Sequence, residues 1–137
     1  MVYASHQIQA SDDIADRLER DKFAALAGAP RSGKTATAIR VCELLHYDSV
    51  LVFTPKAAIP GWHSEIERTG TKTHITVTNY EQAHKLDPDD YDFVILDESH
   101  RLGNRGKPTK RVQSIGRVAY NKPLLIMSGT MIIETPL

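Results

Sequence analysis

Short apolar runs alternate along the chain with amphipathic or polar stretches. The apolar runs that fit buried strands lie at residues 23–27, 50–53, 74–78, 92–96 and 124–127. Helical or loop segments separate these runs, and strands that alternate with helices indicate a parallel sheet joined by crossover helices. The predicted fold class is therefore α/β, a parallel sheet with flanking helices.

The spacing of apolar residues predicts where the helices lie. Ser11 is followed by two acidic residues and by Ile14 and Leu18 on one face, a pattern that is typical of a helix N-terminus. A second helix follows residue 34, a third runs from Pro60 to Gly70, a short one covers 81–86 and an amphipathic one covers 108–120. Trp62 falls in the third helix, where we expect it to pack in the core.

Composition indicates one globular domain. The chain has 137 residues, of which 41% are apolar and 25% charged, a normal balance for a folded protein. The formal net charge is zero, so no global field attracts the protein to nucleic acid or to an anionic membrane. Charge is nevertheless segmented, because residues 101–122 contain seven basic residues and no acid, whereas 81–98 is rich in acids.

Cysteine content and hydropathy indicate the compartment. Cys42 is the single cysteine, which excludes an internal disulfide and gives no sign of a cysteine metal site. No apolar stretch approaches the length of a membrane span. We therefore expect a soluble protein of a reducing compartment, cytoplasmic or nuclear (nucleoid), with no membrane partner.

Residues 28–35, with the sequence GAPRSGKT, match the phosphate-binding pattern G-x-x-x-x-G-K-[ST] between a predicted strand and a predicted helix. In such a loop, backbone N–H groups surround phosphate oxygens, and the helix N-terminus adds its partial positive charge. Lys34 would reach the β- and γ-phosphates, and the Thr35 hydroxyl would bind Mg²⁺. The residues expected to contact the nucleotide here are Gly28, Arg31, Ser32, Gly33, Lys34 and Thr35.

Two adjacent carboxylates, Asp97 and Glu98, follow the apolar run at 93–96. A run of this kind is typical of a central parallel strand, and ligands bind at the carboxyl ends of such strands. We expect Asp97 to hold Mg²⁺, directly or through water, and Glu98 to act as the base that prepares the attacking water. With Lys34, these two residues are the predicted catalytic set.

In this order, the phosphate loop, the DESH segment at 97–100 and the SGT segment at 128–130 resemble the first RecA-like lobe of superfamily 2 helicases and translocases. More narrowly, the chain looks like the Snf-type remodeller branch, with a DExH-type box. Further similar segments are VFTPK at 52–56, WHSEI at 62–66, TNYE at 78–81 and RLGN at 101–104. The stretch at 29–32 and Gly103 depart from the pattern of the remodellers. The resemblance implies a P-loop NTPase fold of RecA type, a three-layer sandwich.

The resemblance also implies contacts with nucleic acid. The turn formed by Thr54, Pro55 and Lys56 corresponds to one that contacts the nucleic-acid backbone in the family; the alternative is a simple strand-end turn. Basic residues after the DESH segment, Arg101 and Arg105, could line a nucleic-acid channel, because phosphate neutralisation needs such clusters. Lys110 and Arg117 instead fit the solvated face of the amphipathic helix.

Other residues take on roles that only the resemblance supplies. Gln7 is similar to a glutamine that reads adenine through its amide, which favours ATP; the alternative is an ordinary exposed glutamine. The segment of Ser128, Gly129 and Thr130 would couple the state of the bound nucleotide to the binding of nucleic acid, through hydrogen bonds toward the DESH segment. His100 could contact this element or be an ordinary loop histidine.

Three functions are compatible with these residues. The first is the ATP- and Mg²⁺-dependent lobe of a nucleic-acid-dependent ATPase, with DNA favoured over RNA as the nucleic acid. This lobe would be weak alone and completed by a second RecA-like lobe on another chain or a missing segment. The second is a non-catalytic module that binds nucleotide or nucleic acid and regulates a partner. The third is a small phosphotransferase, although the Asp97-Glu98 pair fits the activation of water better than transfer to a metabolite.

Overall fold

The computed structural model describes residues 3–27, 33–97 and 110–128. Its centre is a five-stranded sheet in the order β1-β5-β4-β2-β3, in which all neighbouring strands are parallel. The strands are β1 Phe23–Ala27, β2 Ser49–Phe53, β3 His74–Thr78, β4 Phe93–Leu96 and β5 Leu124–Ser128. Each predicted strand is present, and the predicted parallel α/β class is confirmed.

The central strands carry apolar side chains to both faces of the sheet. Along β4, Phe93 and Ile95 belong to one apolar cluster, whereas Val94 and Leu96 belong to a second one. Successive side chains of a strand point to opposite faces, so the two clusters lie on opposite sides of the sheet. This explains why β4 reads as an unbroken apolar run.

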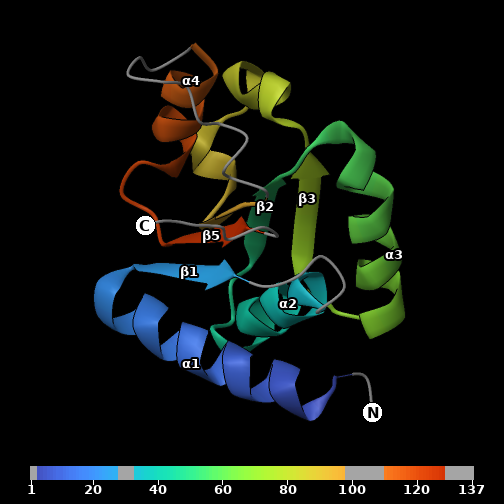
Figure 1. The fold of residues 1–137 in the computed structure, drawn as a ribbon. Helices are drawn as coiled ribbons and strands as arrows, with labels where there is room; N and C mark the ends of the chain where they lie inside the picture. The colour runs from blue at the N-terminus through green and yellow to red at the C-terminus, as the bar shows by residue number, and fades with distance from the viewer. Residues whose placement is uncertain (1–2, 28–32, 98–109, 129–137) are drawn as a thin grey trace, which may run out of the picture.

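Three helices cover one face of the sheet (Figure 1). They are α1 Ser5–Asp21, α2 Lys34–Leu44 and α3 Ile59–Thr69, which follows the 3₁₀ turn η1 Lys56–Ala58. Their apolar residues, among them Leu18, Ile39 and Trp62, pack on the strands in the first cluster. Gly70 ends α3 in the left-handed conformation with φ of 65°, as the sequence predicts.

The other face is covered by α4 Lys110–Ala119 together with the 3₁₀ segments η2 Tyr80–Lys85 and η3 Pro88–Asp90. Ile115 and Val118 of α4 pack with Tyr80 in the second cluster. Arg117 does more than the solvated role expected for it, since its Nη2 donates to the carbonyls of Ala83 and Leu86, at 3.3 and 2.7 Å. The fold is thus a sandwich of three layers.

The predicted start of the first helix was wrong. The helix begins at Ser5, and Ser11 lies buried in its interior. The Ser11 hydroxyl donates to the Ile8 carbonyl at 2.9 Å and accepts from Arg40 Nη1 at 2.6 Å, so it serves helix packing rather than a cap. At the true start, Gln7 Oε1 accepts the N–H of Ala4 at 2.8 Å. A serine followed by acidic residues has the same sequence pattern whether it caps a helix or lies buried in the interior of one.

In the part of the chain that the structure describes, no helix combines the length and the apolar character needed to cross a bilayer.

Candidate nucleotide and metal site

The N-terminus of α2 forms one side of the candidate site. Gly33 precedes the helix with φ of 80° and ψ of 28°, a left-handed conformation that glycine adopts without steric cost. Its carbonyl accepts from the N–H and from the hydroxyl of Thr37, each at 3.1 Å, so the helix starts at once with Lys34. The first turn of a helix leaves N–H groups unpaired and carries partial positive charge, which favours an anion.

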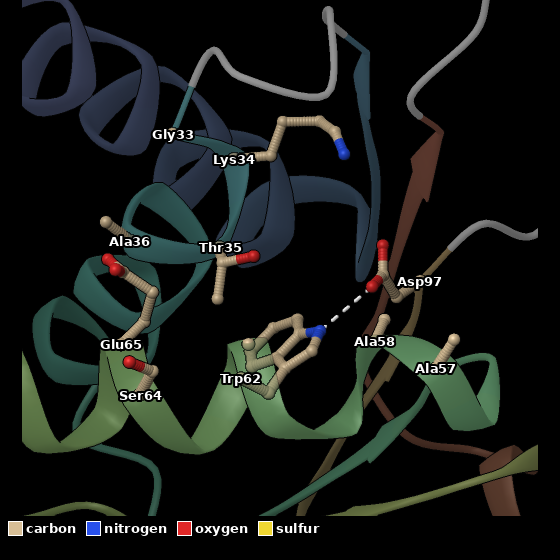
Figure 2. A pocket seen from close by; sticks show the side chains of 11 residues that line it. Gly33, Lys34, Thr35, Ala36, Ala57, Ala58, Trp62, Ser64, Glu65 and Asp97 are labelled. Carbon is tan, nitrogen blue, oxygen red and sulfur yellow. Dashed lines mark hydrogen bonds between the residues drawn. The ribbon is translucent and has the colours of Figure 1, made fainter.

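A pocket of about 510 Å³ opens in front of this helix start. It is lined by the first turn of α2, by the segment from Ala57 to Glu65 and by Asp97. Figure 2 shows the side chains of Lys34, Thr35 and Asp97 turned toward one shared space. Its size is in the range of pockets that hold small ligands. The structure therefore brings together residues that the sequence places sixty positions apart.

The strand order explains this meeting. The segment that leads to α2 leaves β1, and Asp97 follows β4, while β5 lies between these two strands. All strands are parallel, so their carboxyl ends share one edge of the sheet, where ligands of α/β proteins bind. Ser128 ends β5 at the same edge, so its backbone lies between the end of β1, which leads to α2, and the end of β4, which leads to Asp97.

Asp97 is only 5% exposed, and its carboxylate is held from one side. Its Oδ2 accepts a hydrogen bond from Thr54 Oγ1 at 2.7 Å and another from Trp62 Nε1 at 2.9 Å. No other described residue donates to this carboxylate, so Oδ1 has no partner among them. A buried carboxylate with one oxygen bound and one oxygen turned to a pocket is suited to bind a cation.

The backbone of Asp97 is fixed as well. Its N–H donates to the Phe53 carbonyl at 2.7 Å, and its carbonyl accepts from the hydroxyl of Tyr80. The ring of Tyr80 stacks on Phe53 with centroids 5.8 Å apart. The residue that leads to Glu98 is therefore anchored by β2 and η2 as well as by its own strand.

Lys34 is a buried cation, 8% exposed, that makes no ion pair with any described residue. Burying a charge without a partner is costly, and a bound anion would offset that cost. The position of Lys34, beside the helix N-terminus and facing the pocket, suits the phosphates of a nucleotide.

The donor set at this pocket fits magnesium. Thr35 offers a hydroxyl and Asp97 a carboxylate oxygen, and hard oxygen donors are the ligands that Mg²⁺ prefers. Mg²⁺ usually keeps several waters and binds through one or two carboxylates together with substrate phosphates, so a small protein contribution is enough. Within the described ranges, no three His, Cys, Asp or Glu side chains come together as a metal cluster.

The candidate nucleic-acid turn divides into a buried and an exposed part. Thr54 is fully buried, and its hydroxyl is already bound to Asp97, so it faces the interior of the domain. Pro55 is half-buried and Lys56 is exposed at the start of η1. Of the three side chains, Lys56 is the one that a nucleic-acid backbone could reach without rearrangement.

Gln7 lies close to the phosphate loop. It is 8% exposed in the first turn of α1, and its Nε2 donates to the Gly33 carbonyl at 3.3 Å. It is therefore a buried residue rather than the ordinary exposed glutamine of the alternative interpretation. Its contact with adenine stays a prediction.

The remaining predicted site residues lie outside the described residues, and their roles stay predictions. They are Gly28, Arg31, Ser32, Glu98, His100, Arg101, Arg105, Gly129 and Thr130.

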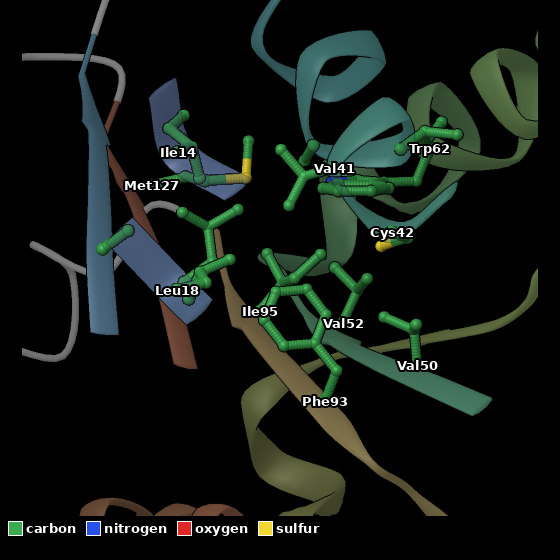
Figure 3. Packing of buried hydrophobic residues seen from close by; sticks show 14 residues of the cluster. Ile14, Leu18, Val41, Cys42, Val50, Val52, Trp62, Phe93, Ile95 and Met127 are labelled. Atoms are coloured by element: carbon green, nitrogen blue, oxygen red, sulfur yellow. The ribbon is translucent and has the colours of Figure 1, made fainter. Parts of the chain in front are cut away.

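Sequence reasoning placed Trp62 in the core but missed its place in the site. The ring is 1% exposed and packs against the first cluster beside Val41 and Cys42 (Figure 3). Its indole N–H nevertheless reaches Asp97. A signal for this bond existed, because a buried tryptophan usually finds an acceptor for its N–H.

The fold is a RecA-like α/β sandwich, similar to that of two solved helicase-type structures. The SWI2/SNF2 ATPase core of Sulfolobus solfataricus, solved in complex with double-stranded DNA, matches with a TM-score of 0.71 and 17% identity over 93% of this chain and 32% of that one. A nuclease-deletion mutant of the Type ISP restriction-modification enzyme LlaGI, solved with a DNA substrate mimic, matches with a TM-score of 0.67 and 15% identity over 96% of this chain and 18% of that one.

At these identities the matches establish the fold, and they confirm the RecA-like α/β sandwich that the sequence predicts. The chain spans about a third or less of the solved chains that it matches. No protein-family model matches the sequence, and a search of curated proteins finds no match.

Proposed function

We propose that this chain is the ATP-binding lobe of a nucleic-acid-dependent ATPase of the helicase or translocase type. The observation that carries the proposal is the convergence of Lys34, Thr35 and Asp97 on one pocket at the carboxyl edge of a parallel sheet. The fold shared with an ATPase core supports it.

In this proposal the nucleotide lies with its phosphates against the first turn of α2. Lys34 neutralises the β- and γ-phosphates, and the unpaired N–H groups of the helix start bind their oxygens. Gln7, bonded to Gly33 at the end of the loop, reads adenine and favours ATP. The residues of the loop at 28–32 would bind the remaining phosphate oxygens.

Thr35 and Asp97 would hold the magnesium ion, which when bound supplies positive charge to the phosphate oxygens. Glu98, the next residue in the chain, accepts the proton of the attacking water. Lys34 and the helix N-terminus stabilise the charge that develops on the γ-phosphate. The anchored backbone of Asp97 keeps the start of the DESH segment at the edge of the pocket.

The proposed polymer partner is DNA, because both compared structures are complexes with DNA or a DNA mimic. Lys56 and Pro55, with Arg101 and Arg105, would contact its backbone. The segment 128–130, together with His100, would couple this contact to the nucleotide. A second RecA-like lobe, on another chain or in another part of a longer protein, would supply an arginine finger, which is typically worth roughly 10³–10⁵-fold in rate.

The first test is binding of a fluorescent ATP analogue and steady-state ATP hydrolysis by the purified chain, with and without DNA or RNA. We expect magnesium-dependent binding that falls at least about tenfold in Lys34→Ala, since Lys34 supplies a charge-assisted contact to phosphate. Lys72→Ala is the matched control, because Lys72 is exposed before β3, at the opposite edge of the sheet. Glu98→Gln should bind the analogue and lose any turnover.

Binding that is absent, or that is the same in Lys34→Ala and Lys72→Ala, would overturn the proposal. Tight binding without turnover in the presence of every nucleic acid would mark either an ATPase lobe that needs its second lobe for hydrolysis or a non-catalytic module.

A further inference from the structure

The two oxygens of the Asp97 carboxylate differ in their surroundings. Oδ2 accepts from Thr54 Oγ1 at 2.7 Å and from Trp62 Nε1 at 2.9 Å, and both donors are buried, at 0% and 1% exposure. Oδ1 has no donor among the described residues, and Asp97 lines the pocket. The carboxylate is planar, so holding one oxygen from two directions also fixes where the other one points.

The two donors come from different elements. Thr54 directly follows β2, which pairs with β4 in the register Phe53↔Leu96, so it lies beside the end of the strand that carries Asp97. Trp62 comes from α3, and its ring is packed in the first apolar cluster (Figures 2 and 3). A rotation of the Asp97 side chain would break both hydrogen bonds and leave two buried donors unpaired, which is costly.

Both donors are neutral. A hydroxyl and an indole N–H orient a carboxylate without cancelling its charge, whereas a lysine or an arginine in the same place would compete with a metal ion for it. No described lysine, arginine or histidine forms an ion pair with Asp97. The negative charge of this buried group therefore stays available to the pocket.

We propose that Thr54 and Trp62 are positioning residues that hold Asp97 so that its Oδ1 faces the magnesium ion of a bound Mg–nucleotide complex. The proposal rests on the function proposed above. It gives Thr54 an internal role in place of a phosphate contact. Partners that orient metal ligands in this way typically change metal affinity by about 10–100-fold when they are removed.

The test compares Thr54→Val, which keeps the side-chain shape without the hydroxyl, with Thr54→Ser, which keeps the hydroxyl. The measurement is the affinity for a fluorescent ATP analogue over a series of free Mg²⁺ concentrations and in excess chelator. In Thr54→Val we expect the Mg²⁺ concentration for half-maximal binding to rise about 10–100-fold. Thr54→Ser should stay near the wild-type value, and binding in chelator should be equal in all three proteins.

Trp62 offers a second variant and a second readout. Trp62→Phe keeps an aromatic ring and removes the N–H donor, and it should shift the Mg²⁺ dependence in the same direction as Thr54→Val. Trp62 is the single tryptophan of the chain, so its emission reports on the surroundings of Asp97 directly. Addition of Mg²⁺ to the nucleotide-bound protein should change that emission, at higher Mg²⁺ concentrations in Thr54→Val than in wild type.

The outcomes separate this proposal from the one on which it rests. If the wild-type chain binds nucleotide and depends on Lys34, but Thr54→Val and Trp62→Phe, both folded by circular dichroism, keep its Mg²⁺ dependence, the positioning role is wrong and the proposed function stands. Equal weakening with Mg²⁺ and in chelator would also overturn it, because that pattern marks a merely structural bond. A wild-type chain that binds no nucleotide overturns both.

Discussion

Gln7 Nε2 lies 3.3 Å from the carbonyl oxygen of Gly33, so the first turn of α1 is tied to the residue from which α2 starts. The other amide atom of Gln7 accepts the N–H of Ala4 at 2.8 Å. The side chain therefore has no freedom to move aside without breaking a bond. This connection makes the conformation of Gly33 depend on a helix that precedes the phosphate loop.

Gly33→Ala should disturb this connection. A Cβ at Gly33 would lie 2.0 Å from Gln7 Nε2, and the backbone has φ of 80°. We expect the free energy of unfolding to fall by about 1–3 kcal/mol, the usual cost of a non-glycine residue in a strained backbone conformation. Denaturant unfolding followed by circular dichroism measures it.

Gly116→Ala is the matched control, because it lies within α4 with nothing within 4 Å of an added Cβ. There we expect a gain of about 0.5–1 kcal/mol, since alanine is the better helix former. Equal effects of the two substitutions would contradict the conformational constraint at Gly33.

Arg40 should contribute to the attachment of α1 on α2. Its Nη1 donates to the Ile8 carbonyl at 3.2 Å, to Ser11 Oγ at 2.6 Å and to Asp12 Oδ1 at 2.9 Å. Arg40→Met keeps the aliphatic length and removes these bonds, and we expect a loss of about 1–3 kcal/mol because a buried hydroxyl and a carbonyl lose a charged donor. Thermal or denaturant unfolding measures the loss.

Asp12→Asn tests how much of this effect is the ion pair alone. The Asp12 side chain is 57% exposed, so water screens its attraction to Arg40. We expect a much smaller loss than in Arg40→Met. An equal loss in both variants would show that the exposed pair, rather than the bonds to Ile8 and Ser11, holds the two helices.

The strands and most helix ends could be predicted because their signals are local. The run at 93–96 is apolar throughout since its residues face two apolar clusters, and Gly70 ends α3 because a left-handed residue is needed there. The start of α1 could not be predicted in the same way. Ser11 is buried against Arg40, and that contact exists only once α2 is in place.

In the candidate site, too, features with a local sequence signal could be predicted and features that depend on tertiary contacts could not. The phosphate-loop pattern and the rule for the carboxyl ends of strands were enough to bring Lys34, Thr35 and Asp97 to one pocket. That a buried Trp62 would find an acceptor could be expected, but that Thr54 and Trp62 both bond to Asp97 could not, because this depends on β2 lying next to β4. The order of strands in a parallel sheet is a tertiary property that the alternation of apolar runs does not reveal.

The thiol of Cys42 should be protected in the native protein. Cys42 is fully buried in the first apolar cluster, and burial raises the pKa of its thiol, which lowers the fraction of reactive thiolate. We expect alkylation by iodoacetamide at neutral pH to be far slower in the native chain than in denaturant, with one thiol per chain as the full count.

A Ser5→Cys variant supplies the internal control for this experiment, because Ser5 is exposed at the start of α1. Its added thiol should react quickly while Cys42 stays protected, so mass spectrometry should show one label early and the second one late. Fast labelling of both thiols in the native protein would contradict the burial of Cys42.

Stability should fall as the pH rises through the alkaline range. Burial raises the pKa of Tyr3 from 10.0 to about 12, helped by its hydrogen bond to Glu43, and burial raises the pKa of Tyr47, which stacks on Phe93, to about 12 as well. Burial also raises the pKa of Cys42 above its ordinary 9.0.

In the unfolded chain these three groups lose their protons at lower pH than in the folded one. The unfolded state therefore binds fewer protons between pH 9 and about 12, and the free energy of unfolding decreases with pH in that window.

Denaturant unfolding at a series of pH values checks this dependence. Tyr3→Phe should flatten the part of the decline between pH 10 and about 12, because phenylalanine has no proton to release. Cys42→Ala should flatten the part that begins near pH 9, at some cost in packing. A free energy of unfolding that stays constant or rises through this range in the wild-type chain would contradict the raised pKa values, and with them the burial of these side chains against α2 and β4.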